Sequence, residues 1–247
     1  MDPNRIAELL QPFLNPQALP AGMALSAEQL EFISTYIELL LRWNARVNLT
    51  AVRDAESIVT RHFGESLFLA AYLFSRSLPD TTTDTASRQH ALDLGSGAGF
   101  PGLPLKIYAP ELPLTLVESN HKKAAFLAEV IRALQLKDAF VFSGRIELGH
   151  RKEHPPVVPA GINPAHLITM RAVEHFESAL QTAAALVRYG AKQLRAGRLA
   201  LLLGGTQAEQ VPGSVRDFSW ETPLLVPQSR ERVLLVGQYP AGQVPGE

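Results

Sequence analysis

The segment ALDLGSGAGFPG, residues 91–102, contains the clearest chemical pattern in the sequence. An apolar run leads through Asp93 into four glycines within eight residues. A strand, a glycine-rich turn and a helix present backbone N–H groups and a helix N-terminus to a polar ligand, because no Cβ blocks its approach. Glu118 follows at the end of the next apolar run, where a carboxylate can accept hydrogen bonds from ribose hydroxyls. The pattern therefore predicts a ligand that contains a nucleoside.

Three interpretations of this loop compete: a purely structural turn, a dinucleotide site and a site for S-adenosylmethionine (SAM). Residues 97–102 match the dinucleotide pattern G-x-G-x-x-G literally. The carboxylate of Asp93, however, suits the ammonium of a methionine moiety and would repel a pyrophosphate. The two apolar runs near the C-terminus, RLALLLG and RERVLLVG, also resemble the appended antiparallel strand of SAM-dependent methyltransferases. We therefore predict SAM as the cofactor, bound by Asp93, Gly95, Gly97 and Glu118.

A pattern of alternating strands and helices has to position these residues. Short apolar runs predict strands over residues 90–94, 112–118, 138–143, 166–170, 198–204 and 230–237, with helices between several of them. Such alternation implies parallel strands joined by right-handed crossovers. The predicted fold class is α/β: a doubly wound, mostly parallel, Rossmann-like sheet of the SAM-dependent methyltransferase type, with an antiparallel C-terminal strand.

The chain before this sheet has helical periodicity. Residues 4–14, 26–43 and 57–74 each predict one helix, and Ser26 followed by Gln29 predicts a capping box. Their apolar faces need a surface to cover. The resulting domain prediction is a helical extension over residues 1–78 docked on the core, a polar linker over residues 79–89 and a SAM-binding core over residues 90–247.

Composition excludes several classes of protein. The 247 residues are 46% hydrophobic with a net charge of −1, which indicates a globular chain without a global excess of positive charge. The absence of cysteine excludes disulfides, thiolate metal sites and a cysteine nucleophile, and no metal is expected. No apolar stretch approaches the roughly 20 residues of a membrane span, and the N-terminus lacks the features of a signal peptide. We expect no membrane association and a cytoplasmic location.

Basic residues are nevertheless concentrated in two places. Residues 121–152 contain seven Lys or Arg residues against three acidic ones, and residues 42–62 contain four against two. Solvated helix faces would explain such modest excesses, and contact with RNA phosphates is the other interpretation. The predicted RNA-binding residues are Arg42, Arg46, Arg61, Lys122 and Lys123.

Several blocks between about residues 42 and 237 resemble one known family. These are RWNARVNLTAVRD, RHFGES, DLGSGAGFPGLPLKI, HKKAAFL, SGRIE, TMRA and RERVLLV, in this order. They are similar to the RsmG (GidB) family of bacterial methyltransferases, which act on guanine N7 in small-subunit 16S rRNA. The resemblance implies that 16S rRNA or the small ribosomal subunit is the substrate. It also implies SAM contacts at Gly95, Phe100, Ile146, Glu147 and Arg171.

The chain departs from the family pattern at three positions. Glu65 stands where aspartate is usual, Met170 where serine is common, and Leu203 where many members have lysine. The last change removes a possible contact with RNA or cofactor.

The remaining chemistry agrees with an N7 target. Guanine N7 presents a lone pair, so no proton has to leave before attack and no general base is required. We predict that Arg171 positions either the cofactor carboxylate or an RNA phosphate. His62 is predicted to be a packing or hydrogen-bonding residue, and Asn44 to cap a helix end. The alternatives are a methyltransferase of a small acceptor and a non-catalytic SAM- or nucleotide-binding module. A monomer without an obligate protein partner is expected.

Overall fold

The computed structural model describes residues 1–14, 24–75, 90–146, 162–194 and 197–240. The predicted linker over residues 79–89 and the predicted cofactor residue Glu147 lie outside these ranges. The elements, in chain order, are α1 (Pro3–Leu14), α2 (Ala27–Asn44), α3 (Ala55–Ile58), the π-helix η1 (Val59–Gly64), α4 (Glu65–Ser75), β1 (Ala91–Leu94), α5 (Gly102–Tyr108), β2 (Leu114–Glu118), α6 (His121–Ala133), β3 (Ala139–Ser143), β4 (Leu167–Arg171), α7 (Phe176–Leu194), β5 (Gly197–Gly204), α8 (Gly205–Ser214), β6 (Ser219–Trp220), β7 (Leu224–Leu225) and β8 (Arg232–Tyr239).

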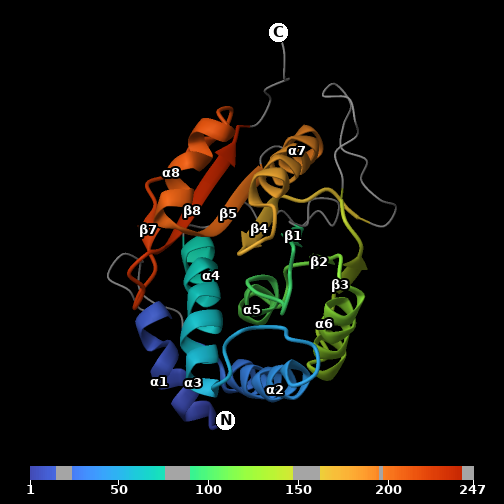
Figure 1. Ribbon diagram of the computed structural model, residues 1–247, viewed down its shortest axis with the longest axis vertical. Coiled ribbons are helices and arrows are strands. Elements are labelled where there is room, and N and C mark those ends of the chain that lie inside the picture. Colours follow the sequence, from blue (N-terminus) through green and yellow to red (C-terminus); the bar gives the residue numbers. More distant parts are fainter. Residues whose placement is uncertain (15–23, 76–89, 147–161, 195–196, 241–247) are drawn as a thin grey trace.

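The strands form one sheet in the order β3-β2-β1-β4-β5-β8-β6, with β7 also paired to β8 (Figure 1). β1 to β5 are parallel, and β8 is antiparallel to β5. The predicted fold class and all six predicted strands are confirmed. The strand order reverses between β1 and β4, and a crevice at such a reversal is where open α/β sheets bind ligands.

The two faces of the sheet are covered by different helices. Because side chains alternate along a strand, Leu92 and Ile168 pack with α7 and α8, whereas Ala91 and Leu167 pack with α1, α2, α4 and α5. Figure 1 shows α7 and α8 above the sheet and the N-terminal helices below it. The N-terminal helices therefore share one continuous core with the sheet. The division into domains at residues 78 and 90 stays a prediction.

The predicted capping box at the start of α2 is confirmed. The Ser26 hydroxyl accepts a hydrogen bond from the Gln29 amide at 3.2 Å, and the Gln29 side-chain oxygen accepts one from the Ser26 amide at 2.8 Å. The side-chain amide nitrogen of Gln29 also donates a hydrogen bond to the carbonyl of Ile107 at 2.8 Å, which fixes α2 against α5.

The single helix predicted over residues 57–74 is wrong in detail. The segment consists of α3, the π-helical turn η1 and α4. Apolar periodicity does not distinguish a π turn from an α turn. In the structure the turn is also contacted by a residue distant in sequence, since Arg171 donates a hydrogen bond to the carbonyl of Arg61 at 2.9 Å. α8, β6 and β7 were also not predicted, and the two strands span only two residues each, too few to show a period of two. Among the described residues, no helix is both long and apolar enough to cross a bilayer.

Candidate cofactor and acceptor site

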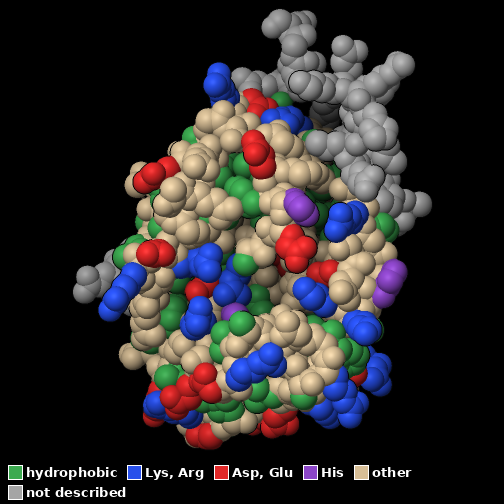
Figure 2. Space-filling view, viewed as in Figure 1, with side chains coloured by type: hydrophobic (Ala, Val, Ile, Leu, Met, Phe, Trp, Pro, Cys, Tyr) green, Lys and Arg blue, Asp and Glu red, His purple; other side chains and the backbone are tan. Residues whose placement is uncertain are grey.

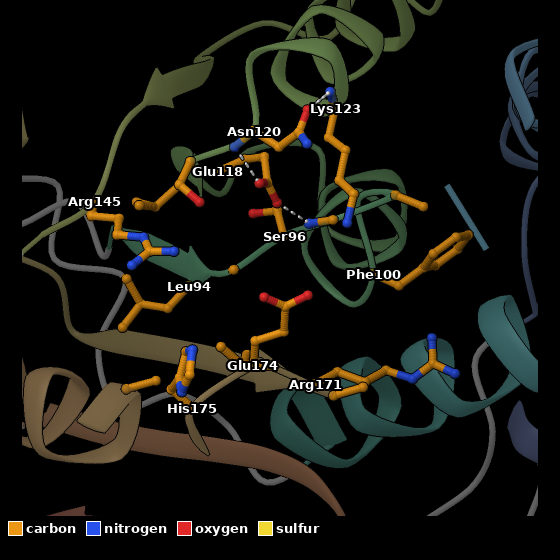
Figure 3. Close-up of a pocket in the computed structure, with 18 of the residues that line it drawn as sticks. Leu94, Ser96, Phe100, Glu118, Asn120, Lys123, Arg145, Arg171, Glu174 and His175 are labelled. Atoms are coloured by element: carbon orange, nitrogen blue, oxygen red, sulfur yellow. Dashed lines mark hydrogen bonds between the residues drawn. The ribbon is translucent and has the colours of Figure 1, made fainter. Parts of the chain in front are cut away.

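A cavity of about 900 Å³ opens at the carboxyl ends of β1, β2 and β4. Figure 2 shows a hollow near the centre of this face, with Lys and Arg side chains on both sides of it, and Figure 3 shows its lining residues. The walls come from four parts of the chain: the end of β1 with the glycine loop (residues 94–98 and Phe100), the end of β2 with the start of α6 (residues 117–120 and Lys123), the ends of β3 and β4 with the start of α7 (residues 144–146 and 171–175, Ser178, Ala179 and Thr182), and the N-terminal region (Leu49, Thr50 and His62).

The glycine loop requires glycine for conformational and steric reasons. Gly95 and Gly99 have φ angles of +68° and +90°, which residues with a Cβ rarely adopt. A Cβ on Gly99 would also collide with the hydroxyl of Tyr36. The loop is held from inside as well, because the Ser96 hydroxyl donates to the Asp93 carbonyl at 2.9 Å. The backbone of the loop is thus exposed to the cavity in one defined conformation.

Glu118 links this loop to the next strand end. Its carboxylate accepts a hydrogen bond from the Gly97 amide at 2.8 Å and another from the Asn120 amide at 2.7 Å (Figure 3). The side chain is buried, and it lines the cavity. Each carboxylate oxygen has a second lone pair, so the group can still accept hydrogen bonds from a bound diol. The predicted ribose-binding carboxylate is therefore at the cavity wall and already oriented.

Asp93 lies beneath the glycine loop and is not among the cavity-lining residues. The side chain is fully buried, and one oxygen accepts a hydrogen bond from the Thr169 hydroxyl at 2.7 Å. The other oxygen has no hydrogen-bond partner within the described residues. Burial raises the pKa of Asp93 to about 6. The sequence placed this carboxylate against a cofactor ammonium, and that assignment stays a prediction.

Phe100 forms part of an aromatic cluster between the glycine loop and the N-terminal helices. Its ring stacks on Tyr36 with 5.4 Å between centroids, meets Phe63 edge-on at 5.1 Å and contacts His62 at 4.9 Å. The Tyr36 hydroxyl donates a hydrogen bond to the Ala98 carbonyl. Phe100 lines the cavity, and α2 packs against the loop that carries it. The predicted residue Ile146 also lines the cavity, and SAM contact stays a prediction for both residues.

Arg171, the predicted active-site residue, connects β4 to the π-helical turn. Its Nε donates to Glu65 at 3.0 Å, and one terminal nitrogen donates to the Arg61 carbonyl at 2.9 Å and to His62 Nδ1 at 3.0 Å. The Arg171 and Glu65 side chains are each only 10% exposed. Figure 3 shows the Arg171 side chain extending away from the glycine loop. Burial lowers the pKa of Arg171, and the Glu65 carboxylate opposes that shift.

His62 makes hydrogen bonds through both ring nitrogens. Nδ1 faces an Arg171 N–H, so it must accept, and the tautomer assigned from this network has Nε2–H donating to the Thr50 hydroxyl at 2.7 Å. Burial, followed by the charge of Arg171, lowers the pKa of His62 to about 3. The ring is therefore neutral at physiological pH and has the hydrogen-bonding role predicted for it. Asn44, similarly, organises the loop after α2 through hydrogen bonds with Thr50.

The predicted RNA-binding residues fall in different places. Lys123 lines the cavity, and Lys122 is exposed beside it at the start of α6. Arg61 is exposed next to Arg171. Arg42 pairs with Glu129 at 3.1 Å, and Arg46 is exposed outside the cavity lining. RNA contact stays a prediction for all five.

The sequence did not single out Thr50, Arg145, Glu174 and His175, all of which line the cavity. Glu174 and His175 directly follow β4, so the rule that ligands bind at the carboxyl ends of parallel strands could have identified them. Their loop has an uncommon shape, since Ala172 and His175 have positive φ angles of 48° and 51°. No local sequence pattern points to Thr50, because it is tied to the cavity wall through its hydrogen bond with His62.

The family model and the curated relatives that the sequence matches agree on one family. A family model described as rRNA small subunit methyltransferase G (GidB) matches residues 29–196. The chain is 40% identical over 178 residues to the ribosomal RNA small subunit methyltransferase G of Roseiflexus castenholzii, covering 70% of this chain and 67% of that protein. It is 34% identical over 227 residues to the protein of the same name from Chloroflexus aggregans, covering 87% and 84%. A solved structure of a SAM-dependent methyltransferase from Aquifex aeolicus overlays with a TM-score of 0.47 and 14% identity, over 62% of this chain and 82% of that one.

Proposed function

Because the chain belongs to the rRNA small subunit methyltransferase G (GidB) family, we propose that it transfers the methyl group of SAM to N7 of a guanosine in 16S rRNA. One observation carries the proposal. A single cavity joins a wall suited to a nucleoside, built by the glycine loop and Glu118, to a second wall in which His62 and Arg171 are held by hydrogen bonds.

The residues of the first wall fit SAM. Glu118 would accept hydrogen bonds from the ribose hydroxyls, and the backbone at Gly95 and Gly97 would lie against the methionine moiety. Ile146, with Leu94 and Val117, gives an apolar surface suited to the adenine ring. Asp93 would act from beneath the loop, where a buried carboxylate favours a nearby ammonium. SAM supplies an electrophilic methyl group on a sulfonium, which an in-line nucleophile can displace.

The protein's task in this reaction is alignment and exclusion of water. Guanine N7 attacks with a lone pair and loses no proton, so the site needs no general base. Two of the titratable groups on the walls are engaged in the structure, since His62 uses both nitrogens in hydrogen bonds and each Glu118 oxygen accepts one. Glu174 and His175 also line the cavity, and the proposed reaction assigns them no proton transfer. We propose that Arg171 is a positioning residue, which holds His62 and Thr50 in place where the acceptor enters.

The test is incubation with SAM labelled in the methyl group and either naked 16S rRNA or assembled small subunits. We expect label in RNA, released as N7-methylguanosine on nucleoside analysis. Label in RNA at another atom would overturn the N7 assignment. Label that enters only a small acceptor, or tight SAM binding without turnover on either RNA, would favour the two alternative functions.

The proposal also specifies where the protein acts. A substrate within the small ribosomal subunit implies a cytoplasmic location, and a cavity built by one chain is compatible with a monomer. Both statements remain proposals, as does the absence of an obligate protein partner.

A further inference from the structure

We infer that Arg171 and Arg232, which share the Glu65 carboxylate, and the neighbouring Arg61 form a site for an RNA backbone phosphate at the edge of the cavity. The inference rests on the proposed function, because it assumes that an RNA nucleotide enters the cavity. We call these three residues the arginine cluster.

The cluster brings together three distant parts of the chain. Arg61 lies on the π-helical turn, Arg171 ends β4, and Arg232 begins β8. One oxygen of Glu65 is 3.0 Å from Arg171 and 3.5 Å from Nε of Arg232. Arg61 joins the group through its carbonyl oxygen, which accepts from Arg171 at 2.9 Å. Tertiary contacts therefore hold the cluster in place, and it does not depend on a single flexible side chain.

The charges within the cluster do not balance. Two guanidinium groups, those of Arg171 and Arg232, share the Glu65 carboxylate, and Arg61 adds a third positive charge that lowers the pKa of Arg171. The carboxylate is 10% exposed, whereas the Arg232 side chain is 30% exposed and Arg61 is exposed. Within the described residues, Arg232 makes an ion pair with no acid other than Glu65, and Arg61 makes none. His62 is neutral, so it neither adds to the charge nor reduces it. The solvent-facing side of the cluster is thus positive and has unused N–H donors, which suits an anion.

The position of the cluster identifies the anion. Arg171 and His62 both line the cavity, so the cluster lies at its edge on the side of the N-terminal helices. Glu118, a proposed cofactor residue, lies on the other side of the glycine loop from Arg171 (Figure 3). A base that enters the cavity leaves its own phosphates at the edge. An RNA phosphate therefore fits this position better than the carboxylate of the cofactor.

The test removes the most accessible partner of Glu65. Arg232→Gln is compared with Arg216→Gln, which removes the same charge from an exposed arginine between α8 and β6, outside the cavity. RNA affinity and methylation kinetics are measured on 16S rRNA at several salt concentrations. We expect Arg232→Gln to raise the KM for RNA roughly tenfold and to reduce the log–log salt slope of RNA binding by about 0.7 to 0.9. The dissociation constant for SAM and kcat at saturating RNA should stay within about twofold.

Arg232→Lys keeps the charge and checks that an effect is not due to misfolding. We expect it to keep the wild-type salt slope with an intermediate KM. The inference is overturned if Arg232→Gln and Arg216→Gln have the same salt slope and the same RNA affinity. This outcome is separate from failure of the proposed function, because RNA binding is measured whether or not wild-type protein methylates N7.

Discussion

Glu118→Gln tests how the cofactor wall is built. In the wild-type protein the carboxylate accepts one hydrogen bond from the Gly97 amide and one from the Asn120 amide, at 2.8 and 2.7 Å. Glutamine has the same shape but only one acceptor oxygen. Whichever way its amide turns, one backbone N–H faces an NH₂ group and loses its partner. The change therefore disturbs the glycine loop without altering the packing.

The expected magnitude follows from these two bonds. A hydrogen bond to a charged group contributes about 1.5 to 3 kcal/mol, and Glu118→Gln removes one of them. In the variant the free loop can leave this conformation, and SAM binding must restore it at that cost. Because about 1.4 kcal/mol corresponds to a factor of ten, the dissociation constant for SAM should rise by up to roughly a hundredfold. An additional loss of affinity for SAM is expected if the ribose hydroxyls donate hydrogen bonds to the same carboxylate.

The measurement is isothermal titration calorimetry with SAM, with circular dichroism to verify the fold. Glu209→Gln is the control, since Glu209 is exposed on α8 outside the cavity and should bind SAM like the wild-type protein. Wild-type affinity in Glu118→Gln would refute the assignment of this carboxylate to the cofactor. Weaker binding of both variants would indicate a general charge effect.

Three further changes test other parts of the structure. Burial raises the pKa of Asp93 to about 6, above its usual value near 4, so the folded protein holds the Asp93 proton more tightly than the unfolded chain does. The stabilisation from the protonated carboxyl group is therefore complete below pH 4 and is lost as the pH rises through 6. Urea unfolding should therefore show wild-type stability falling by about 3 kcal/mol relative to Asp93→Asn between about pH 4 and pH 7, and parallel pH profiles would contradict this. Tyr36→Phe leaves the Ala98 carbonyl without its donor, so the free energy of unfolding should fall by roughly 1 to 3 kcal/mol in thermal unfolding, and SAM should bind more weakly. Unchanged SAM affinity would show that this contact with α2 does not support the conformation of the glycine loop that binds SAM. Lys106 is buried and donates to two backbone carbonyls after α5, at 2.6 and 2.8 Å. Lys106→Met should lower the free energy of unfolding by about 2 kcal/mol or more in denaturant titrations, while the folded protein keeps its affinity for SAM. A variant as stable as the wild-type protein would show that water can take the place of the ammonium group at the two carbonyls.

The parts of the fold that follow from local pattern could be predicted from the sequence. The strands of the sheet are short apolar runs, and the helices between them have a period near 3.6, so element type and order were predictable. The capping box of α2 is equally local, since Ser26 and Gln29 stand three residues apart. The π-helical turn could not be predicted, because apolar periodicity does not separate a π turn from an α turn and the Arg171 hydrogen bond to the Arg61 carbonyl comes from 110 residues away along the chain.

The candidate site divides in the same way. Gly95, Gly97 and Glu118 lie at strand ends that the α/β pattern brings together, and the cavity contains all three. The opposite wall depends on tertiary contacts that no spacing encodes. His62 reaches the cavity because the N-terminal helices pack on the sheet, and Thr50 matters only as its hydrogen-bond partner. Arg232 is brought to the edge of the cavity by its ion pair with Glu65, which no sequence spacing indicates.

The contact between Tyr36 and the glycine loop has a consequence for the order in which ligands bind. The Tyr36 hydroxyl donates to the Ala98 carbonyl and its ring stacks on Phe100, so the glycine loop is directly connected to α2. The coupling free energy between two sites is reciprocal. Any factor by which SAM strengthens RNA binding through this contact must therefore equal the factor by which RNA strengthens SAM binding. At equilibrium the ternary complex forms equally well by either route, and only rates can impose an order of addition.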